Sequence, residues 1–131
     1  MPHEPVETVT VPAGGGHLVG DYVAGPGRFA VVWVHGFGSH RGGEKSLSVA
    51  TECRRRGWPF AAFDFRGHGA TGGAMHDLRA SRLLEDLDAV ATFLNDRGHD
   101  RLGLVGSSMG GFAAAWFAKR NPATVVGCVL L

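Results

Sequence analysis

Apolar positions change from an alternating to a continuous pattern within the first part of the chain. Residues 6–11 alternate apolar with polar side chains, which is typical of a strand exposed on one face. Residues 17–25 predict a second strand, and the proline- and glycine-containing stretch between the two predicts a hairpin turn. Residues 29–36 are almost entirely apolar, as in a strand buried on both faces. The same pattern predicts further buried strands at 59–65, 101–107 and 124–131.

Helical periodicity occupies the segments between the buried strands, at 43–57, 81–98 and 109–121. The first helix is expected to end at Gly57 and the second at Gly98, because glycine readily adopts the left-handed conformation found after helices. The inward positions of the first helix are expected to be Leu47, Ala50, Cys53 and the stem of Arg54. Those of the second are expected to be Leu83, Leu84, Leu87, Val90, Ala91 and Leu94.

The predicted order is therefore β-β-β-α-β-α-β-α-β, with a hairpin first and strand–helix alternation afterwards. This order predicts an α/β protein with a doubly wound, mostly parallel sheet, an antiparallel N-terminal hairpin and helices on both faces. Ligands bind at the carboxyl ends of the strands in such sheets. Three glycine-rich turns follow strands at that end, at residues 35–43, 64–73 and 106–111.

Composition narrows the class of protein. The chain has 131 residues, of which 44% are hydrophobic and 19% charged, so we expect one soluble domain over residues 1–131. The formal net charge of +1 gives no general attraction to nucleic acid or to an anionic membrane. The N-terminus has no signal-peptide pattern, and no apolar run is long enough to span a membrane. These features favour a cytoplasmic protein.

The two cysteines and the run of arginines have simple structural interpretations. Cys53 lies in a predicted helix and Cys128 in a predicted strand, without metal-binding spacing. Both are therefore expected to be buried free thiols, as in a reducing compartment. The basic residues 54–56 fall where a helix ends, and a solvated helix terminus explains them.

The turn at residues 106–110 reads G-S-S-M-G and fits the pattern G-x-S-x-G between a strand and a helix. Glycine is needed at 106 and 110 because side chains there would collide in so sharp a turn. The spacing places Ser108 at the apex, with Ser107 as the competing serine. Ser108 is thus a candidate nucleophile, and the Met109 N–H at the start of the helix is a candidate oxyanion donor. An ordinary glycine-rich turn, or one that holds a phosphate, is the structural alternative.

A tetrahedral oxyanion usually needs a second donor, which we expect in the turn after the strand at 29–36. The small residues Gly36 and Gly38 would let the backbone curl so that the Phe37 N–H faces the site. His35 is expected to fix this turn by hydrogen bonding, and proton transfer is the alternative role.

Other polar residues near these turns have structural interpretations too. His68 is expected to be a structural histidine of its turn, and Asp64 and Arg66 could form an ion pair that holds the two turns together. The histidines do not match a metal-binding spacing, so neither a metal nor a cofactor is expected. The histidines that could be zinc ligands are His35, His40, His68 and His76.

Three motifs occur in this order along the chain: HGFGS from His35, DFRGHG from Asp64 and GSSMGG from Gly106. Together they resemble the α/β-hydrolase superfamily, and within it the serine-aminopeptidase-like group of carboxylesterases and thioesterases. The G-E-K stretch at 43–45 and the L-E-D-L stretch at 84–87 are similar to that group as well. The resemblance runs from about Phe29 to Leu131. It implies a serine esterase with Ser108 as nucleophile and the Met109 and Phe37 N–H groups as oxyanion hole.

The resemblance also implies an acid and then a histidine after the nucleophile. Residues 109–131 contain no Asp, Glu or His. We therefore expect an incomplete domain that lacks its C-terminal strands, with the triad acid and base supplied from elsewhere. His35 and His68 are possible earlier bases, although no carboxylate is expected to hold either of them in the required geometry.

Two functional hypotheses remain at this point. The first is a hydrolase of small-molecule carboxylic esters or thioesters that works through an acyl-enzyme on Ser108. The second is an inactive remnant or binding module that keeps the fold without the triad. An unpaired last strand would also allow self-association or pairing with a partner. The acyl group, the leaving group, the oligomeric state and the choice among esterase, thioesterase and peptidase are not encoded in these motifs. A dehalogenase is disfavoured, because that related branch carries Asp at the position of Ser108.

Overall fold

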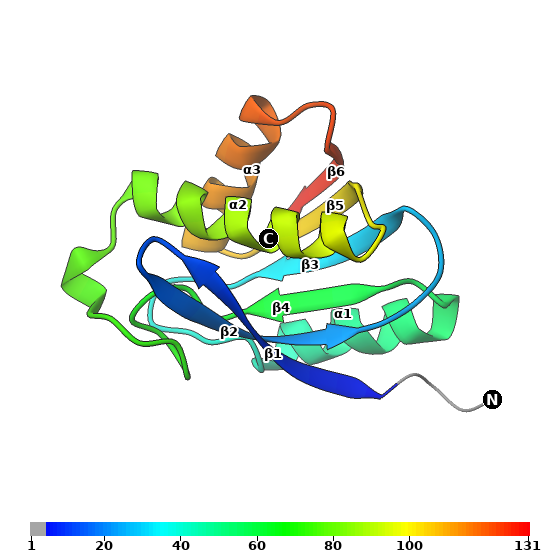
Figure 1. Ribbon diagram of the computed structural model, residues 1–131, viewed down its shortest axis with the longest axis horizontal. Coiled ribbons are helices and arrows are strands. Elements are labelled where there is room, and N and C mark those ends of the chain that lie inside the picture. Colours follow the sequence, from blue (N-terminus) through cyan, green and yellow to red (C-terminus); the bar gives the residue numbers. More distant parts are fainter. Residues whose placement is uncertain (1–4) are drawn as a thin grey trace.

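The computed structural model describes residues 5–131 and contains one six-stranded sheet with the strand order β1-β2-β4-β3-β5-β6 (Figure 1). The strands are β1 (Val6–Ala13), β2 (Gly16–Val23), β3 (Phe29–Val34), β4 (Phe60–Phe63), β5 (Arg101–Gly106) and β6 (Val125–Leu130). The helices are α1 (Glu44–Arg56), α2 (Ala80–Asp96) and α3 (Met109–Arg120), with a short 3-10 turn η1 (Met75–Asp77) before α2.

The sheet is antiparallel at its N-terminal edge and parallel elsewhere. β1 pairs with β2, and β2 with β4, in antiparallel register. β3 runs parallel to both β4 and β5, and β5 runs parallel to β6. The expected α/β architecture with an N-terminal hairpin is confirmed. Because the chain returns past β3 to form β5, the strand order reverses there, and ligands bind outside the carboxyl ends of strands at such a reversal.

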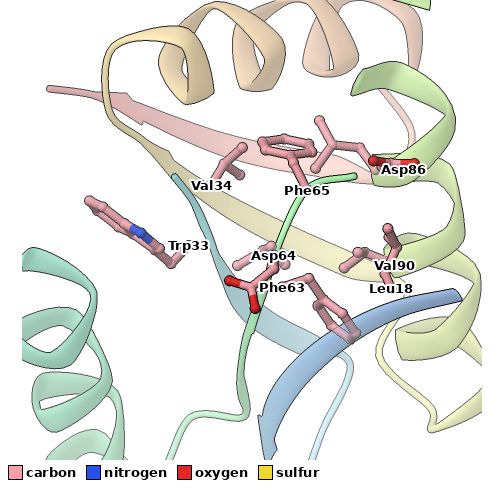
Figure 2. Close-up of a pocket in the computed structure, with 10 residues that line it drawn as sticks. Leu18, Trp33, Val34, Phe63, Asp64, Phe65, Asp86 and Val90 are labelled. Atoms are coloured by element: carbon pink, nitrogen blue, oxygen red, sulfur yellow. The ribbon is translucent and has the colours of Figure 1, made fainter. Parts of the chain in front are cut away.

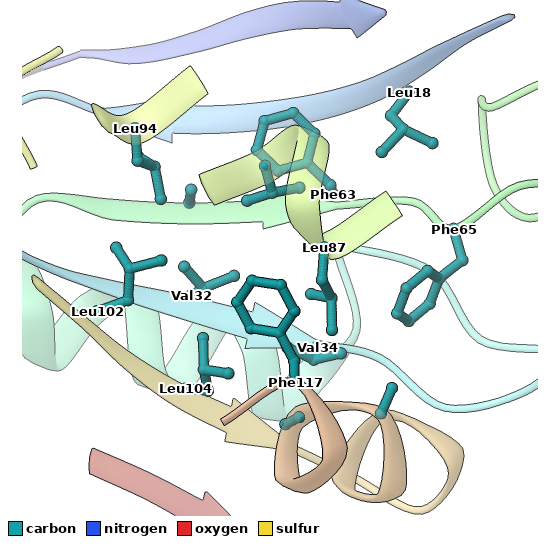
Figure 3. Close-up of a cluster of buried hydrophobic side chains, with 14 of the residues drawn as sticks. Leu18, Val32, Val34, Phe63, Phe65, Leu87, Leu94, Leu102, Leu104 and Phe117 are labelled. Atoms are coloured by element: carbon teal, nitrogen blue, oxygen red, sulfur yellow. The ribbon is translucent and has the colours of Figure 1, made fainter. Parts of the chain in front are cut away.

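Helices cover both faces of this sheet. α2 and α3 pack on one face over the larger hydrophobic core, and α1 packs on the other over a smaller one (Figures 1 and 3). The expected inward stripe of α2 is confirmed for Leu83, Leu84, Leu87, Val90 and Leu94. Gly57 follows α1 with a φ of 73°, in the left-handed conformation predicted for a helix end. These layers fix the positions of the three turns at the carboxyl ends of β3, β4 and β5.

Of the predicted inward positions of α1, Ala50 and Cys53 are confirmed, whereas Leu47 is wrong. Leu47 is 59% exposed, whereas the neighbouring Ser46 is only 2% exposed. α1 contacts the smaller core through Val49, Ala50 and Cys53, and a helical repeat brings Ser46 onto that face. Leu47 was expected inside because it is apolar, but the small polar Ser46 occupies the buried position in that turn of the helix.

β6 is also not the buried strand that its apolar sequence predicted. Only Val125 is buried in this strand, while Val129 and Leu130 are exposed. Within the described residues, β6 pairs with β5 alone and forms an edge of the sheet. Cys128 consequently is exposed, which corrects the expectation that both thiols are buried, whereas Cys53 is buried as expected.

The two thiols should therefore react at very different rates. Burial raises the pKa of Cys53 to about 11, so only about one thiolate in a thousand forms near pH 8. We expect iodoacetamide to modify Cys128 in the native protein and Cys53 only after denaturation, as read by intact mass. The Cys128→Ser variant should then show no native modification. Equal modification of the two thiols would contradict the burial described above.

Across residues 5–131, none of the helices has the length and apolar character required to cross a lipid bilayer.

Candidate active site

Ser108 lies in the tight turn between β5 and α3. Its backbone has φ 56° and ψ −121°, and it is the one non-glycine residue with positive φ among residues 5–131. Hydrogen bonds hold the turn: the Ser107 N–H donates to Val34 O at 3.2 Å, and the Gly110 N–H donates to Ser107 O at 2.9 Å. A residue kept in this sparsely populated conformation points to a functional constraint rather than to local preference.

The glycines around Ser108 are required by close backbone contacts. A Cβ atom on Gly106 would lie 2.5 Å from Gly110 O, and one on Gly110 would overlap the carbonyl oxygens of Val34 and His35. These are contacts with main-chain atoms, which cannot move aside as a flexible side chain can. The turn therefore packs α3 directly against the ends of β3 and β5.

The turn after β3 approaches Ser108 from the neighbouring strand. A Cβ atom on Gly36 would lie 3.1 Å from Ser107 O and 3.3 Å from Ser108 Cβ, so only glycine allows this approach without displacement. Phe37 follows, and this residue is 61% exposed. A cavity of about 360 Å³ opens beside Ser108 and is lined by Trp33, Gly36, Phe37, Ser39, Gly43, Glu44, Lys45 and Ser107.

His35 is fully buried and uses both ring nitrogens on backbone groups. Its Nε2 accepts from the Phe65 N–H at 2.9 Å, which leaves the proton on Nδ1 to donate to Gly36 O at 2.7 Å. Burial lowers the pKa of His35, which favours this neutral form. In a trans peptide the C=O and the following N–H point in opposite directions. The His35 bond to Gly36 O therefore fixes the direction of the Phe37 N–H.

His68 is buried in the turn after β4 and has a matching arrangement. Its Nε2 accepts from the Gly38 N–H at 2.9 Å, and its Nδ1 donates to Arg66 O at 3.1 Å. Neither His35 nor His68 has a ring nitrogen left to accept a proton from Ser108. Both histidines act here as links between turns.

The expected ion pair between Asp64 and Arg66 is wrong. Asp64 is fully buried and pairs with Arg41, whose Nη1 lies 2.5 Å from Asp64 Oδ2. Arg66 instead donates to Asp86 and Glu85 of α2, at 2.8 Å each. The two residues therefore pair with different segments, Asp64 with the end of the turn after β3 and Arg66 with α2.

Asp86 is a buried polar residue that the sequence analysis missed. It is 1% exposed, and Figure 2 shows Asp64 and Asp86 entering the interior from different elements, the end of β4 and α2. Burial raises the pKa of Asp86, and hydrogen bonds from Arg66 oppose that rise. Its place in the inward stripe of α2, three residues after Leu83 and four before Val90, is the sequence feature that could have revealed it.

Metal ligation does not account for these polar residues. Among the residues that the structure describes, no three His, Cys, Asp or Glu side chains come together as a ligand set. The polar groups around the turns are instead satisfied by one another and by backbone atoms.

Comparison with known proteins relates the chain to a family and to individual relatives. The family model described as serine aminopeptidase, S33, matches residues 25–131. Palmitoyl-protein thioesterase ABHD10, mitochondrial, from Rattus norvegicus is 26% identical over 99 residues, which cover 76% of this chain and 32% of that protein.

Solved structures share the fold over nearly the whole chain. The crystal structure of a protein from Agrobacterium vitis S4 matches with a TM-score of 0.83 at 31% identity. The match covers 99% of this chain and 52% of that protein chain. The Pyrococcus furiosus esterase Pf2001 has a TM-score of 0.81 at 25% identity, covering 95% and 50%. The chain thus spans about a third of the curated relative and about half of each solved structure.

Proposed function

We propose that this chain, which belongs to the serine aminopeptidase S33 family of α/β hydrolases, carries the nucleophile of an enzyme that hydrolyses carboxylic esters or thioesters. One observation carries the proposal: Ser108 has positive φ between a parallel strand and a helix N-terminus, beside a cavity. The esterase and thioesterase names of the similar proteins support the substrate class.

In the proposed reaction the Ser108 Oγ attacks the acyl carbonyl carbon, and a base removes the hydroxyl proton. The carbonyl oxygen becomes an oxyanion, which the Met109 and Phe37 N–H groups stabilise. Met109 is suited to this role because it begins α3, where first-turn N–H groups have no partner within the helix. The C–O or C–S bond then breaks, and the alcohol or thiol leaves with the proton. Water attacks the acyl-enzyme in the same way and releases the acid.

The base and its carboxylate are proposed to come from polypeptide outside these 131 residues. Residues 109–131 contain no Asp, Glu or His, and both ring nitrogens of His35 and His68 are already hydrogen-bonded to backbone groups. The exposed edge strand β6, with Val129 and Leu130, offers a place for such polypeptide to pack. Self-association through β6 is the competing proposal for that edge.

We propose a cytoplasmic location, with free thiols at Cys53 and Cys128 in support. The name of the rat relative, in contrast, assigns that protein to mitochondria.

The acyl-enzyme can be tested by pre-steady-state kinetics on the protein expressed from its whole reading frame. With p-nitrophenyl acetate and a matched thioester, we expect a burst of one leaving group per active site, followed by slower turnover. The Ser107→Ala variant, measured in the same way, should show the same burst of leaving group as the wild type. Hydrolysis that proceeds without any Ser108-dependent step would exclude the mechanism, and complete inactivity would favour an inactive remnant or binding module.

A further inference from the structure

Three hydrogen bonds cross between the turn after β3 and the segment after β4. His35, after β3, accepts from the Phe65 N–H, while His68, after β4, accepts from the Gly38 N–H. Asp64 Oδ1 accepts from the Arg41 N–H at 2.6 Å. Each segment thus supplies a buried acceptor for a backbone N–H of the other.

Asp64 is the centre of the third link. Its carboxylate also accepts from the Ala70 N–H at 3.0 Å and from the guanidinium of Arg41. Arg41 Nε reaches Asp21 of β2 at 3.0 Å. The fully buried carboxylate therefore holds the end of the β3 turn against the segment after β4, and Arg41 links that turn to β2.

The segment held in this way has little apolar packing of its own. Residues 37–40 are all exposed, and the Phe37 ring makes an edge contact with the His68 ring at 5.7 Å between centroids. The order of such a loop depends on its hydrogen bonds rather than on burial. Its two ends are fixed by His35 at Gly36 and by Asp64 at Arg41, and its middle is fixed by His68 at Gly38.

The His68 link has a direct consequence for Phe37. His35 orients the peptide group that precedes the Phe37 Cα, and His68 orients the peptide group that follows it, through the Gly38 N–H. With both neighbouring planes fixed, the φ and ψ angles of Phe37 are fixed as well. Without His68, the second plane loses its buried acceptor and keeps only the turn hydrogen bond from the Ser39 N–H to Gly36 O at 3.1 Å. The Phe37 N–H is then held less firmly, by His35 and that turn hydrogen bond alone.

We propose that His68 and Asp64 are positioning residues that preorganise the Phe37 N–H as an oxyanion donor without contacting the substrate. This proposal rests on the proposed function of Ser108. A donor that acts on the developing oxyanion contributes to the transition state more than to substrate binding, so its loss lowers kcat more than it changes KM. Removing one oxyanion donor costs roughly 100- to 1,000-fold in kcat, and misdirecting one should cost about 10- to 100-fold.

The decisive variants are His68→Leu, which removes the acceptor, and His68→Gln, whose side-chain oxygen can replace Nε2. His99 provides a matched control, because it is equally buried and uses both ring nitrogens, on the Tyr22 hydroxyl and Gly27 O. His99 lies just before β5, at the opposite end of the sheet from the turns. The His99→Leu variant therefore measures the cost of losing a buried histidine as such.

Two readouts are needed, one of them independent of activity. Amide hydrogen exchange should show faster exchange at Phe37 and Gly38 in His68→Leu, recovery in His68→Gln, and no loop-specific change in His99→Leu. In the enzyme with a complete triad, His68→Leu should lower kcat about 10- to 100-fold with KM within about twofold. Unchanged exchange at Gly38, or equal kinetic effects of the His68 and His99 variants, would overturn the proposal.

A wild-type measurement keeps the test decisive if His68→Leu does not fold. The ¹⁵N shift of His68 Nε2 should be that of an unprotonated acceptor, with a scalar coupling to the Gly38 amide across the hydrogen bond. A protonated Nε2 without that coupling would refute the link. Absence of Ser108-dependent hydrolysis in the wild type would overturn the proposed function alone, because the exchange and coupling data still decide whether His68 holds the loop.

Discussion

The Gly110→Ala variant is expected to lose most of the folding stability of the protein. The added methyl group would overlap the carbonyl oxygens of Val34 and His35, at the end of the central strand β3. Relief requires α3 to move away from the sheet, which also separates buried α3 residues such as Phe117 from the larger core. We expect a loss of about 4 kcal/mol or more, out of the roughly 5–15 kcal/mol that stabilises a typical domain.

Urea denaturation followed by circular dichroism measures this loss. The matched control is Gly72→Ala, because an added Cβ there meets no atom within 4 Å and the residue does not have positive φ. The control should remain within about 0.5 kcal/mol of the wild type. Equal denaturation midpoints for the two variants would refute the close packing of the serine turn against β3.

The Ser108→Ala variant is expected to lose at least about 10,000-fold in kcat for ester hydrolysis in the enzyme with its complete triad. Without the hydroxyl, no acyl-enzyme can form, and the oxyanion donors and substrate binding leave only a small residual rate. The turn itself should persist, because alanine keeps the Cβ and the hydrogen bonds around residue 108 come from backbone atoms.

Steady-state kinetics with an activated ester provides the comparison, with Ser107→Ala as the matched control in the same turn. That control should stay within about tenfold of the wild type, because the bonds of Ser107 to Val34 and Gly110 are made by its backbone. Retention of more than a few per cent of the wild-type rate by Ser108→Ala would require another nucleophile.

The arrangement of strands and helices was predictable because hydrophobic periodicity reports burial directly. The alternation in β1 and the continuous apolar runs of β3 and β4 lead to the observed layers. The turn geometry was predictable for a related reason: a serine between two glycines, at the junction of a strand and a helix, has few conformations available. Ser108 lies at the apex of that turn, as expected, and has positive φ.

The errors arise where burial depends on neighbours that are distant in sequence. β6 is as apolar as β5, yet it is exposed because within the described residues it pairs on one side only. In α1 the position of Leu47 was misjudged because Ser46, a polar residue, is the one that is buried there. The hydrophobic pattern along the sequence is the same for an apolar residue that is covered and for one that is exposed at an edge of the sheet.

Polar partners were harder still to predict, because several charged residues follow the same strands. Asp64 and Arg66 are close in sequence, but each pairs with a residue of another segment, Arg41 and Asp86 respectively. The reciprocal use of His35 and His68 as acceptors likewise depends on β3 and β4 lying side by side, which only the assembled sheet provides.

The central claim is that Ser108 is the nucleophile of a serine hydrolase, and covalent labelling tests it most directly. The protein expressed from its whole reading frame would be treated with a fluorophosphonate, digested and mapped by mass spectrometry. We predict a single phosphonyl adduct on Ser108, absent from the Ser108→Ala variant. An adduct on Ser107 or on another residue, or no adduct in a protein that hydrolyses esters, would contradict the account.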